Sequence, residues 1–164
     1  MEQYDLNLKT AARFWEHTVE FILDPRQWVA VVLPIPLNWN IVPFRENGIQ
    51  NVPNDEVGVY SFVVQPDIVD HPNCAYLMYI GQTKNQSFRR RYQQYLRDQR
   101  TKKGRHLVVH MLNTWPDHLW FCYATIQQIQ YIDEIEACLL SAYLPPINSE
   151  YPADVRGPMA LWRS

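Results

Sequence analysis

Two β-prone segments that lie close together in the sequence most constrain how this chain can fold. VGVYSFVVQ (57–65) and AYLMYIGQT (75–83) are separated by PDIVDHPNC, which contains Pro66 and Pro72. Because this connection is rich in turn residues, the two segments are interpreted as an antiparallel pair of strands joined by a loop. The aromatic-rich segment HLWFCYATI (118–126) predicts a third strand.

Three segments with helical periodicity accompany the strands. Ser87 is placed to cap a helix that ends between residues 101 and 104, and HLVVHMLNTW predicts a shorter helix that stops before Pro116. The last segment, YIDEIEACLLSAYL, precedes Pro145-Pro146, which would end its helix abruptly. The apolar positions of the first helix are Phe88, Tyr92, Tyr95 and Leu96, and those of the last are Ile132, Ile135, Leu139, Leu140, Tyr143 and Leu144.

The order β-β-α-α-β-α predicts an α+β domain over residues 55–150, with a small three-stranded antiparallel sheet flanked by helices. Residues 1–54 are expected to form an extension composed of a helix and an arm, and residues 151–164 an irregular tail. The helix is predicted over 6–23, from the spacing of Leu8, Ala11, Ala12, Trp15, Val19, Phe21 and Ile22. The arm is β-prone but broken by Pro34, Pro36 and Pro43, which favours an edge strand or an extended segment.

Composition excludes several classes of protein. Of the 164 residues, 47% are hydrophobic and 20% charged, as in an ordinary globular protein. The longest apolar run, WVAVVLPIPL, is too short and too interrupted by proline to span a bilayer. The N-terminus lacks the pattern of a signal peptide, and Cys74, Cys122 and Cys138 form no C-x-x-C pair. Reduced thiols in a cytoplasmic protein with no membrane partner are therefore expected.

Positive charge is concentrated in one segment of a slightly acidic chain. Residues 84–105 contain nine Lys or Arg and one acid, so this segment has a charge of +8 and the rest of the chain −10. Such a basic patch predicts phosphate binding at one place, although a solvated helix face is the alternative interpretation. The basic residues are Lys84, Arg89, Arg90, Arg91, Arg97, Arg100, Lys102, Lys103 and Arg105.

Two charged residues fall at or beside apolar helix stripes. Glu136 lies four residues after Ile132, which places its carboxylate at or beside the buried side of the last helix. A buried carboxylate needs a cation, a metal or strong hydrogen bonds, whereas one at the edge of the stripe can reach water. Arg91 lies one turn before Tyr95, where it can bind an anion or stack on an aromatic ring.

Five sequence features together resemble the GIY-YIG nuclease family. They are GVY at 58–60, YIG at 79–81, an arginine in the following helix, a helical glutamate at 136, and Asn148 after a proline. The resemblance extends from Val57 to Asn148, with a longer loop between GVY and YIG than in compact members and one extra residue before the arginines. Alignment on Phe88 selects Arg91 as the family's arginine, with Arg90 as the other choice.

The resemblance implies hydrolysis of DNA phosphodiester bonds assisted by Mg²⁺ or Mn²⁺. Glu136 would bind the metal, and Arg91 would contact the scissile phosphate. Tyr60 is the candidate base, Tyr79 and Tyr95 would position the water or relay its proton, and Asn148 would anchor the site. Phosphate contacts are expected from the remaining basic residues, which are Lys84, Arg89, Arg90, Arg97, Arg100, Lys102, Lys103 and Arg105.

Several biological roles remain open at this point. The anatomy is closest to a restriction-type endonuclease, for which a homodimer is one way to cut both strands. A DNA-repair or mobile-element nuclease is an alternative, as is a non-catalytic nucleic-acid-binding module of the same fold. A partner-binding protein that uses the tryptophan-rich stretch RQWVAVVLPIPLNWN is a further alternative. His106, His110 and His118 show no spacing typical of a metal site.

Overall fold

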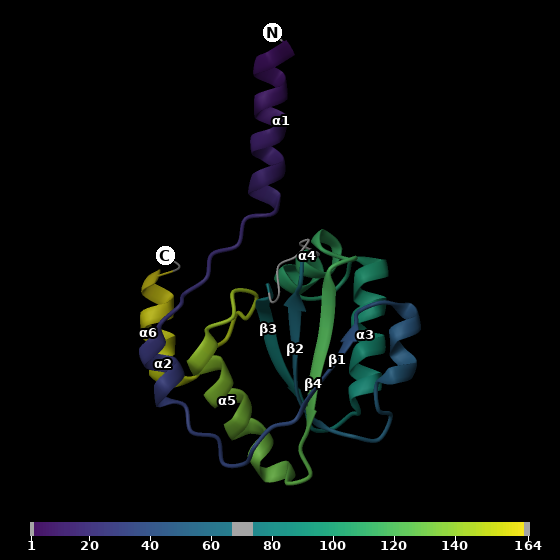
Figure 1. The fold of residues 1–164 in the computed structure, drawn as a ribbon, viewed down its shortest axis with the longest axis vertical. Coiled ribbons are helices and arrows are strands. Elements are labelled where there is room, and N and C mark those ends of the chain that lie inside the picture. Colours follow the sequence, from purple (N-terminus) through teal and green to yellow (C-terminus); the bar gives the residue numbers. More distant parts are fainter. Residues whose placement is uncertain (1, 67–73, 163–164) are drawn as a thin grey trace.

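An antiparallel sheet of four strands forms the centre of the computed structural model, which describes residues 2–66 and 74–162 (Figure 1). The strands are β1 (Trp39–Pro43), β2 (Gly58–Val64), β3 (Tyr76–Thr83) and β4 (Leu119–Thr125), in the order β1-β4-β2-β3. The α+β class is confirmed, but the expected three-stranded sheet is wrong by one strand. The proline-broken arm contributes β1 at an edge of the sheet, where Pro43 removes no hydrogen bond between central strands.

Strands β2 and β3 form the antiparallel pair that the sequence predicts. Tyr60 lies opposite Gly81, and the register shifts between Phe62 and Val63. Of the loop expected to join the two strands, positions 67–73 lie outside the described residues. The antiparallel register places the ends of the GVY and YIG motifs side by side.

Helices cover both faces of the sheet (Figure 1). Helices α3 (Phe88–Thr101) and α4 (His106–Thr114) pack on one face, and α5 (Ile132–Tyr143) packs on the other. Two short 3-10 helices, η1 (Glu46–Asn51) and η2 (Ile129–Tyr131), precede β2 and α5. The α3 side of the core is largely aromatic and the α5 side aliphatic. The α3-side rings include those of Tyr60, Phe62, Tyr79, Phe88, Tyr92, Tyr95 and Phe121.

The stripe predicted for α3 is buried. Ser87 caps the helix by accepting a hydrogen bond from Arg90 N at 3.3 Å, and Phe88, Tyr92 and Tyr95 are buried beneath it. The stripe predicted for α5 is confirmed apart from its end, because Tyr143 is 47% exposed. Leu144, the next residue, packs into a separate small cluster.

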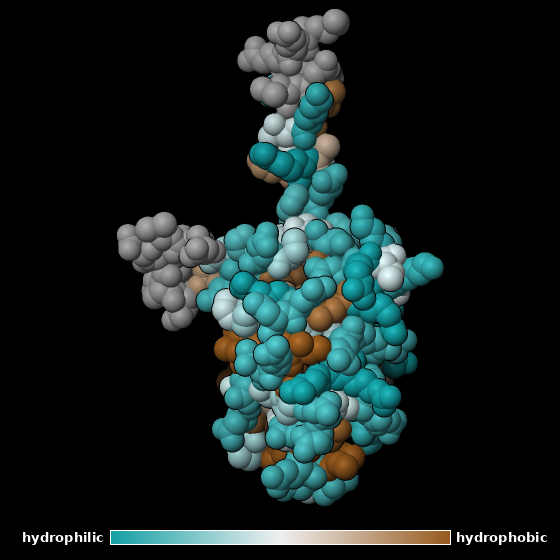
Figure 2. Space-filling model, turned by 90° about the vertical axis from the view of Figure 1, so that its right-hand side faces the viewer, coloured by the Kyte–Doolittle hydropathy of each residue, from teal (hydrophilic) through white to brown (hydrophobic). Residues whose placement is uncertain are grey.

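The N-terminal helix differs from the prediction. Helix α1 (Glu2–Glu16) stands away from the body, and Trp15 at its end is 78% exposed (Figures 1 and 2). The prediction of helix to residue 23 was wrong, because Val19 and Phe21 belong to a non-helical segment and pack on the sheet core. Their spacing of two residues is that of an extended chain rather than a helix.

The tail expected to be irregular instead contains helix α6 (Ala153–Trp162). Val155 and Met159 of α6 are buried in a small cluster with Leu144 and Tyr151. Helix α2 (Pro25–Ala30), from the proline-rich arm, packs against α5. Across the described ranges, no helix is long and apolar enough to cross a membrane.

The Tyr92 hydroxyl ties α3 to the corner that follows β1. It accepts a hydrogen bond from Arg45 N at 2.8 Å, and lies 2.9 Å from Pro43 O and 2.8 Å from Arg45 O. Tyr92→Phe leaves these backbone groups with one partner fewer and is expected to lower the free energy of unfolding by about 1–3 kcal/mol in urea denaturation. Tyr143→Phe is the matched control, because that side chain is half exposed. Equal stability of the two variants would contradict the role of this corner.

Candidate active site

The ring of Tyr60 lies directly across Gly81 of the edge strand β3. A Cβ atom at position 81 would lie 2.6 Å from the Tyr60 hydroxyl and 2.9 Å from the Tyr79 ring. Glycine is therefore required by the close approach of the two tyrosines rather than by its backbone angles. Since no side chain separates them, the Tyr60 hydroxyl reaches across β3 toward the edge of the sheet.

Arg91 and Tyr95, one turn apart on α3, meet this hydroxyl. Arg91 Nε donates to the Tyr60 hydroxyl at 2.9 Å, and the hydroxyls of Tyr60 and Tyr95 lie 2.8 Å apart. Arg91 Nη1 donates to Gln94 Oε1 at 2.7 Å. The structure thus brings Arg91 into the tyrosine cluster, whereas Arg90 is exposed on the other side of the helix.

A second guanidinium group reaches the same cluster from the start of α4. Arg105 Nη2 donates to the Tyr79 hydroxyl at 2.7 Å and lies 3.4 Å from the Tyr95 hydroxyl. The guanidinium carbon lies 5.1 Å from the centre of the Tyr79 ring, within the range of a cation–π contact. The hydroxyls of Tyr60 and Tyr95 therefore connect Arg91 to Arg105.

Neither guanidinium group is paired with a carboxylate. The ion pairs of the described residues are Asp24–Arg26 and Lys84–Asp133, and every hydrogen bond of the Arg91 and Arg105 side chains goes to a neutral oxygen. For the half-buried Arg91 the lack of a counter-charge is costly. Two unpaired guanidinium groups around one cluster of phenols are typical of a site that binds an anion.

The Glu136 carboxylate is a charge of the opposite sign that also lacks a partner in the described part of the chain. It is half-buried on α5 and has no hydrogen bond or ion pair among the described residues. Burial, with a smaller contribution from Asp133, raises its pKa to about 7, although the positive charges of Arg105 and Arg91 act to lower it. The carboxylate is thus near enough to feel both arginines but forms no salt bridge with either.

Tyr60 and Tyr95 of the cluster are neutral phenols. Burial, followed by the neighbouring Tyr95 and Tyr79, raises the pKa of Tyr60 well above its ordinary value, and Arg91 only partly opposes this. The pKa of Tyr95 is also raised, again chiefly by burial. At neutral pH these hydroxyls can donate and accept hydrogen bonds, but in this state of the protein they are poor bases.

The Asn148 side chain forms hydrogen bonds to the backbone of β3 at its free edge, where no further strand of the described residues pairs with it. Its Oδ1 accepts from Ile80 N at 3.0 Å and its Nδ2 donates to Ile80 O at 2.8 Å, so the side chain takes the place of a neighbouring strand. The adjacent Ile147 N donates to Met78 O at 3.0 Å. Asn148 therefore fixes the strand between Tyr79 and Gly81.

The basic residues expected to contact phosphate separate into three groups. Lys84 pairs with Asp133, and Arg89 donates to Val52 O at 2.8 Å, so both have structural partners. Arg105 belongs to the tyrosine cluster. The remaining basic side chains are exposed along α3 and the turn that follows it; they are those of Arg90, Arg97, Arg100, Lys102 and Lys103. The face of the molecule that carries α3 is largely hydrophilic (Figure 2).

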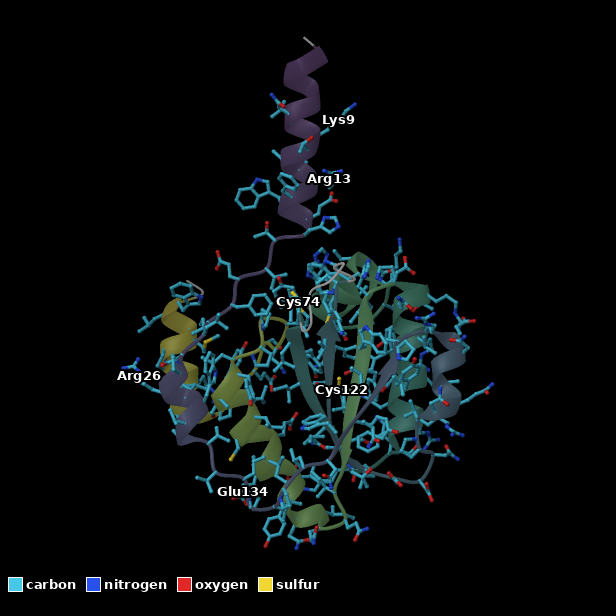
Figure 3. All side chains as sticks on the ribbon, in the orientation of Figure 1. Lys9, Arg13, Arg26, Cys74, Cys122 and Glu134 are labelled. Carbon is cyan, nitrogen blue, oxygen red and sulfur yellow. The ribbon has the colours of Figure 1, made fainter. Side chains whose placement is uncertain are left out.

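Two of the basic residues outside this segment lie on α1. Lys9 and Arg13 extend from α1, away from the sheet (Figure 3), and do not add to the basic surface of α3.

The residues present fit a single hydrated divalent cation. Among residues 2–66 and 74–162, no group of three or more His, Cys, Asp or Glu side chains could hold a metal, and His106, His110 and His118 are exposed. Mg²⁺, however, keeps several water ligands and needs only one or two protein carboxylates. Glu136, partnerless and half-buried, supplies one such oxygen ligand. The buried Gln82 Oε1, which has no hydrogen-bond partner, is another unsatisfied oxygen, on the face of β3 that α5 covers.

Sequence reasoning missed three features of this site. Gln94 could have been found, because it lies three residues after Arg91 on the same helical face. The contact of Arg105 with the tyrosine cluster could not, because it depends on the turn between α3 and α4. The packing of Tyr60 over Gly81 depends on strand register, which the sequence does not determine by itself.

No family model, curated protein or solved structure matches this chain.

Replacing Glu136 tests whether its carboxylate is held in an unfavourable place. Its folded-state pKa is raised from 4.5 to about 7, so the folded protein loses stability as the pH rises from about 4.5 to 7 and does not regain it above that range. At pH 8, Glu136→Gln is expected to raise the free energy of unfolding by about 1–2 kcal/mol, after allowance for partial exposure. At pH 4.5 the gain should largely disappear.

The matched control is Glu134→Gln, an exposed carboxylate two residues earlier on α5. We expect a change within about 0.5 kcal/mol at either pH for this control. A Glu136→Gln protein that is no more stable than wild type at pH 8 would contradict the claim that the charged Glu136 side chain destabilises the folded protein.

Proposed function

We propose that this chain is a metal-dependent endodeoxyribonuclease of the GIY-YIG type that hydrolyses phosphodiester bonds. The observation that carries the proposal is the opposition of two unpaired guanidinium groups and one unpaired carboxylate around a cluster of phenols. A phosphodiester and a divalent cation would satisfy all three charges at once. The restriction-type role, with a homodimer to cut both strands, forms part of the proposal through the family resemblance.

We assign each residue the role that the family resemblance implies and that its surroundings support. Arg91 would bind the non-bridging oxygens of the scissile phosphate with the part of its donor fork that Tyr60 and Gln94 leave free. Glu136 would hold the metal ion, which when bound would neutralise developing negative charge and assist the leaving oxygen. The hydroxyls of Tyr60, Tyr79 and Tyr95 would orient the attacking water. Asn148 would act as a positioning residue through its two hydrogen bonds to Ile80 of β3.

One observation favours a second candidate function, a non-catalytic nucleic-acid-binding module. The pKa of Tyr60 is raised well above its ordinary value, mainly by burial, whereas a general base must lose its proton near neutral pH. For catalysis, a bound cation must offset this effect, or water must be deprotonated by another route. The two candidates differ in turnover, and a cleavage assay separates them.

The test is cleavage of supercoiled and linear DNA by the purified protein in Mg²⁺, Mn²⁺ or EDTA. We expect cleavage that requires the metal, and a loss of at least about a hundredfold in rate for Arg91→Ala and for Glu136→Gln. Glu134→Gln serves as the matched control, since it removes an exposed carboxylate from the same helix. DNA affinity is measured in parallel, because the Glu136 variant should still bind.

Each outcome has one meaning. Wild-type protein that binds DNA without cutting it supports the module and refutes the nuclease. Cleavage by both variants at the wild-type rate would show that the activity resides elsewhere in the chain.

A further inference from the structure

We propose that Arg105 is a second phosphate-contacting residue and forms, with Arg91, a two-guanidinium clamp for one phosphodiester group. Both side chains reach the same tyrosine cluster, from different helices. This inference deepens the proposed function and rests on it only for the identity of the anion as the scissile phosphate. The clamp differs from the general basic surface of α3, whose other exposed residues have no contact with the tyrosines.

The turn between α3 and α4 holds Arg105 in this position. Lys102 at the end of α3 has a φ of 54°, and Gly104 has a φ of 137°, a conformation that favours glycine. A Cβ at position 104 would also lie 3.2 Å from an Asp98 oxygen. Two residues in unusual conformations within the three that precede Arg105 fix the direction from which it enters the site.

Each guanidinium group keeps unused donors. An arginine carries five N–H groups, and within the described residues Arg105 uses only Nη2, on Tyr79 and Tyr95. Arg91 uses Nε and Nη1 and leaves Nη2 free. Two forks with unused N–H groups suit a tetrahedral anion with two non-bridging oxygens.

The neighbouring phenols suit an anion as well. Tyr79 accepts a hydrogen bond from Arg105, so its own O–H proton remains available for donation. Between Tyr60 and Tyr95 a single hydrogen bond uses one of two O–H protons. The cluster therefore presents cations and O–H donors but no negative charge, apart from the more distant Glu136.

The test follows the Nε–Hε NMR signals of Arg91 and Arg105 in ¹⁵N-labelled protein during titration with inorganic phosphate, without metal. We expect both signals to shift along one saturation curve. In Arg105→Ala the phosphate affinity reported by Arg91 should fall about tenfold to a hundredfold. Arg105→Lys should recover only part of the loss, because lysine keeps the charge but lacks the fork. Arg45→Ala, which removes an exposed arginine side chain without a partner, is the control.

Failure of this inference can be distinguished from failure of the proposed function. A shift of Arg91 alone, no shift at all, or an unchanged phosphate affinity in Arg105→Ala overturns the clamp whether or not DNA is cut. Dimethyl phosphate, a diester, should produce the same paired shifts, and shifts with inorganic phosphate alone would overturn the diester assignment. If both signals shift but wild-type protein does not cleave DNA, the result supports the two-guanidinium clamp and refutes the proposed nuclease function.

Discussion

The hydrogen bond from Arg91 to the Tyr60 hydroxyl is the interaction on which the candidate site depends. It holds a partly buried positive charge against a neutral oxygen, where a carboxylate would ordinarily be expected. The same arrangement recurs at Arg105 and Tyr79. The site therefore carries two positive charges that the described part of the chain leaves uncompensated, at some cost to its own stability. Functional sites commonly show such a compromise between stability and activity.

The scaffold explains why these groups meet at the edge of the sheet. Gly81 lets the Tyr60 ring cross β3, and the Asn148 side chain satisfies the backbone of the neighbouring Ile80 from the open side. The edge strand β3 therefore has no side chain at position 81, and hydrogen bonds with Asn148 fix its backbone at position 80. Glu136 on one face of the sheet and the arginines on the other can then influence one another electrostatically. A thicker side chain at position 81 would move Tyr60 away from Arg91.

Much of this fold could be predicted from the sequence. Periodicity located α3, α4 and α5, and the turn-rich loop identified β2 and β3 as an antiparallel pair. The errors came from short segments whose structure depends on tertiary contacts. Val19 and Phe21 fit a helical stripe by spacing but pack on the core from a non-helical segment. For the arm, the sequence predicts either an edge strand or an extended segment, and only the pairing of β1 with β4 decides between them.

The candidate site was predictable to a different degree. Arg91 and Glu136 stood out because each charge falls on an apolar stripe. Arg105 could be recognised only as one of nine basic residues, since its direction is set by the backbone at Lys102 and Gly104. Lys84 and Arg89 belong to the same basic segment, yet their partners are structural. Sequence gives the charge of such a segment but not the partner of each residue.

The central claim is that the unpaired Glu136 carboxylate, which senses the charges of Arg105 and Arg91 but pairs with neither, lies in a place that suits a divalent cation. Titration of the Glu136 side-chain carboxyl carbon by ¹³C NMR, with and without Mg²⁺, tests it most directly. The account predicts a pKa near about 7 in the absence of metal and a clear fall when Mg²⁺ is added, because the cation favours the charged form. An ordinary pKa near 4.5, or one that Mg²⁺ leaves unchanged, would contradict it.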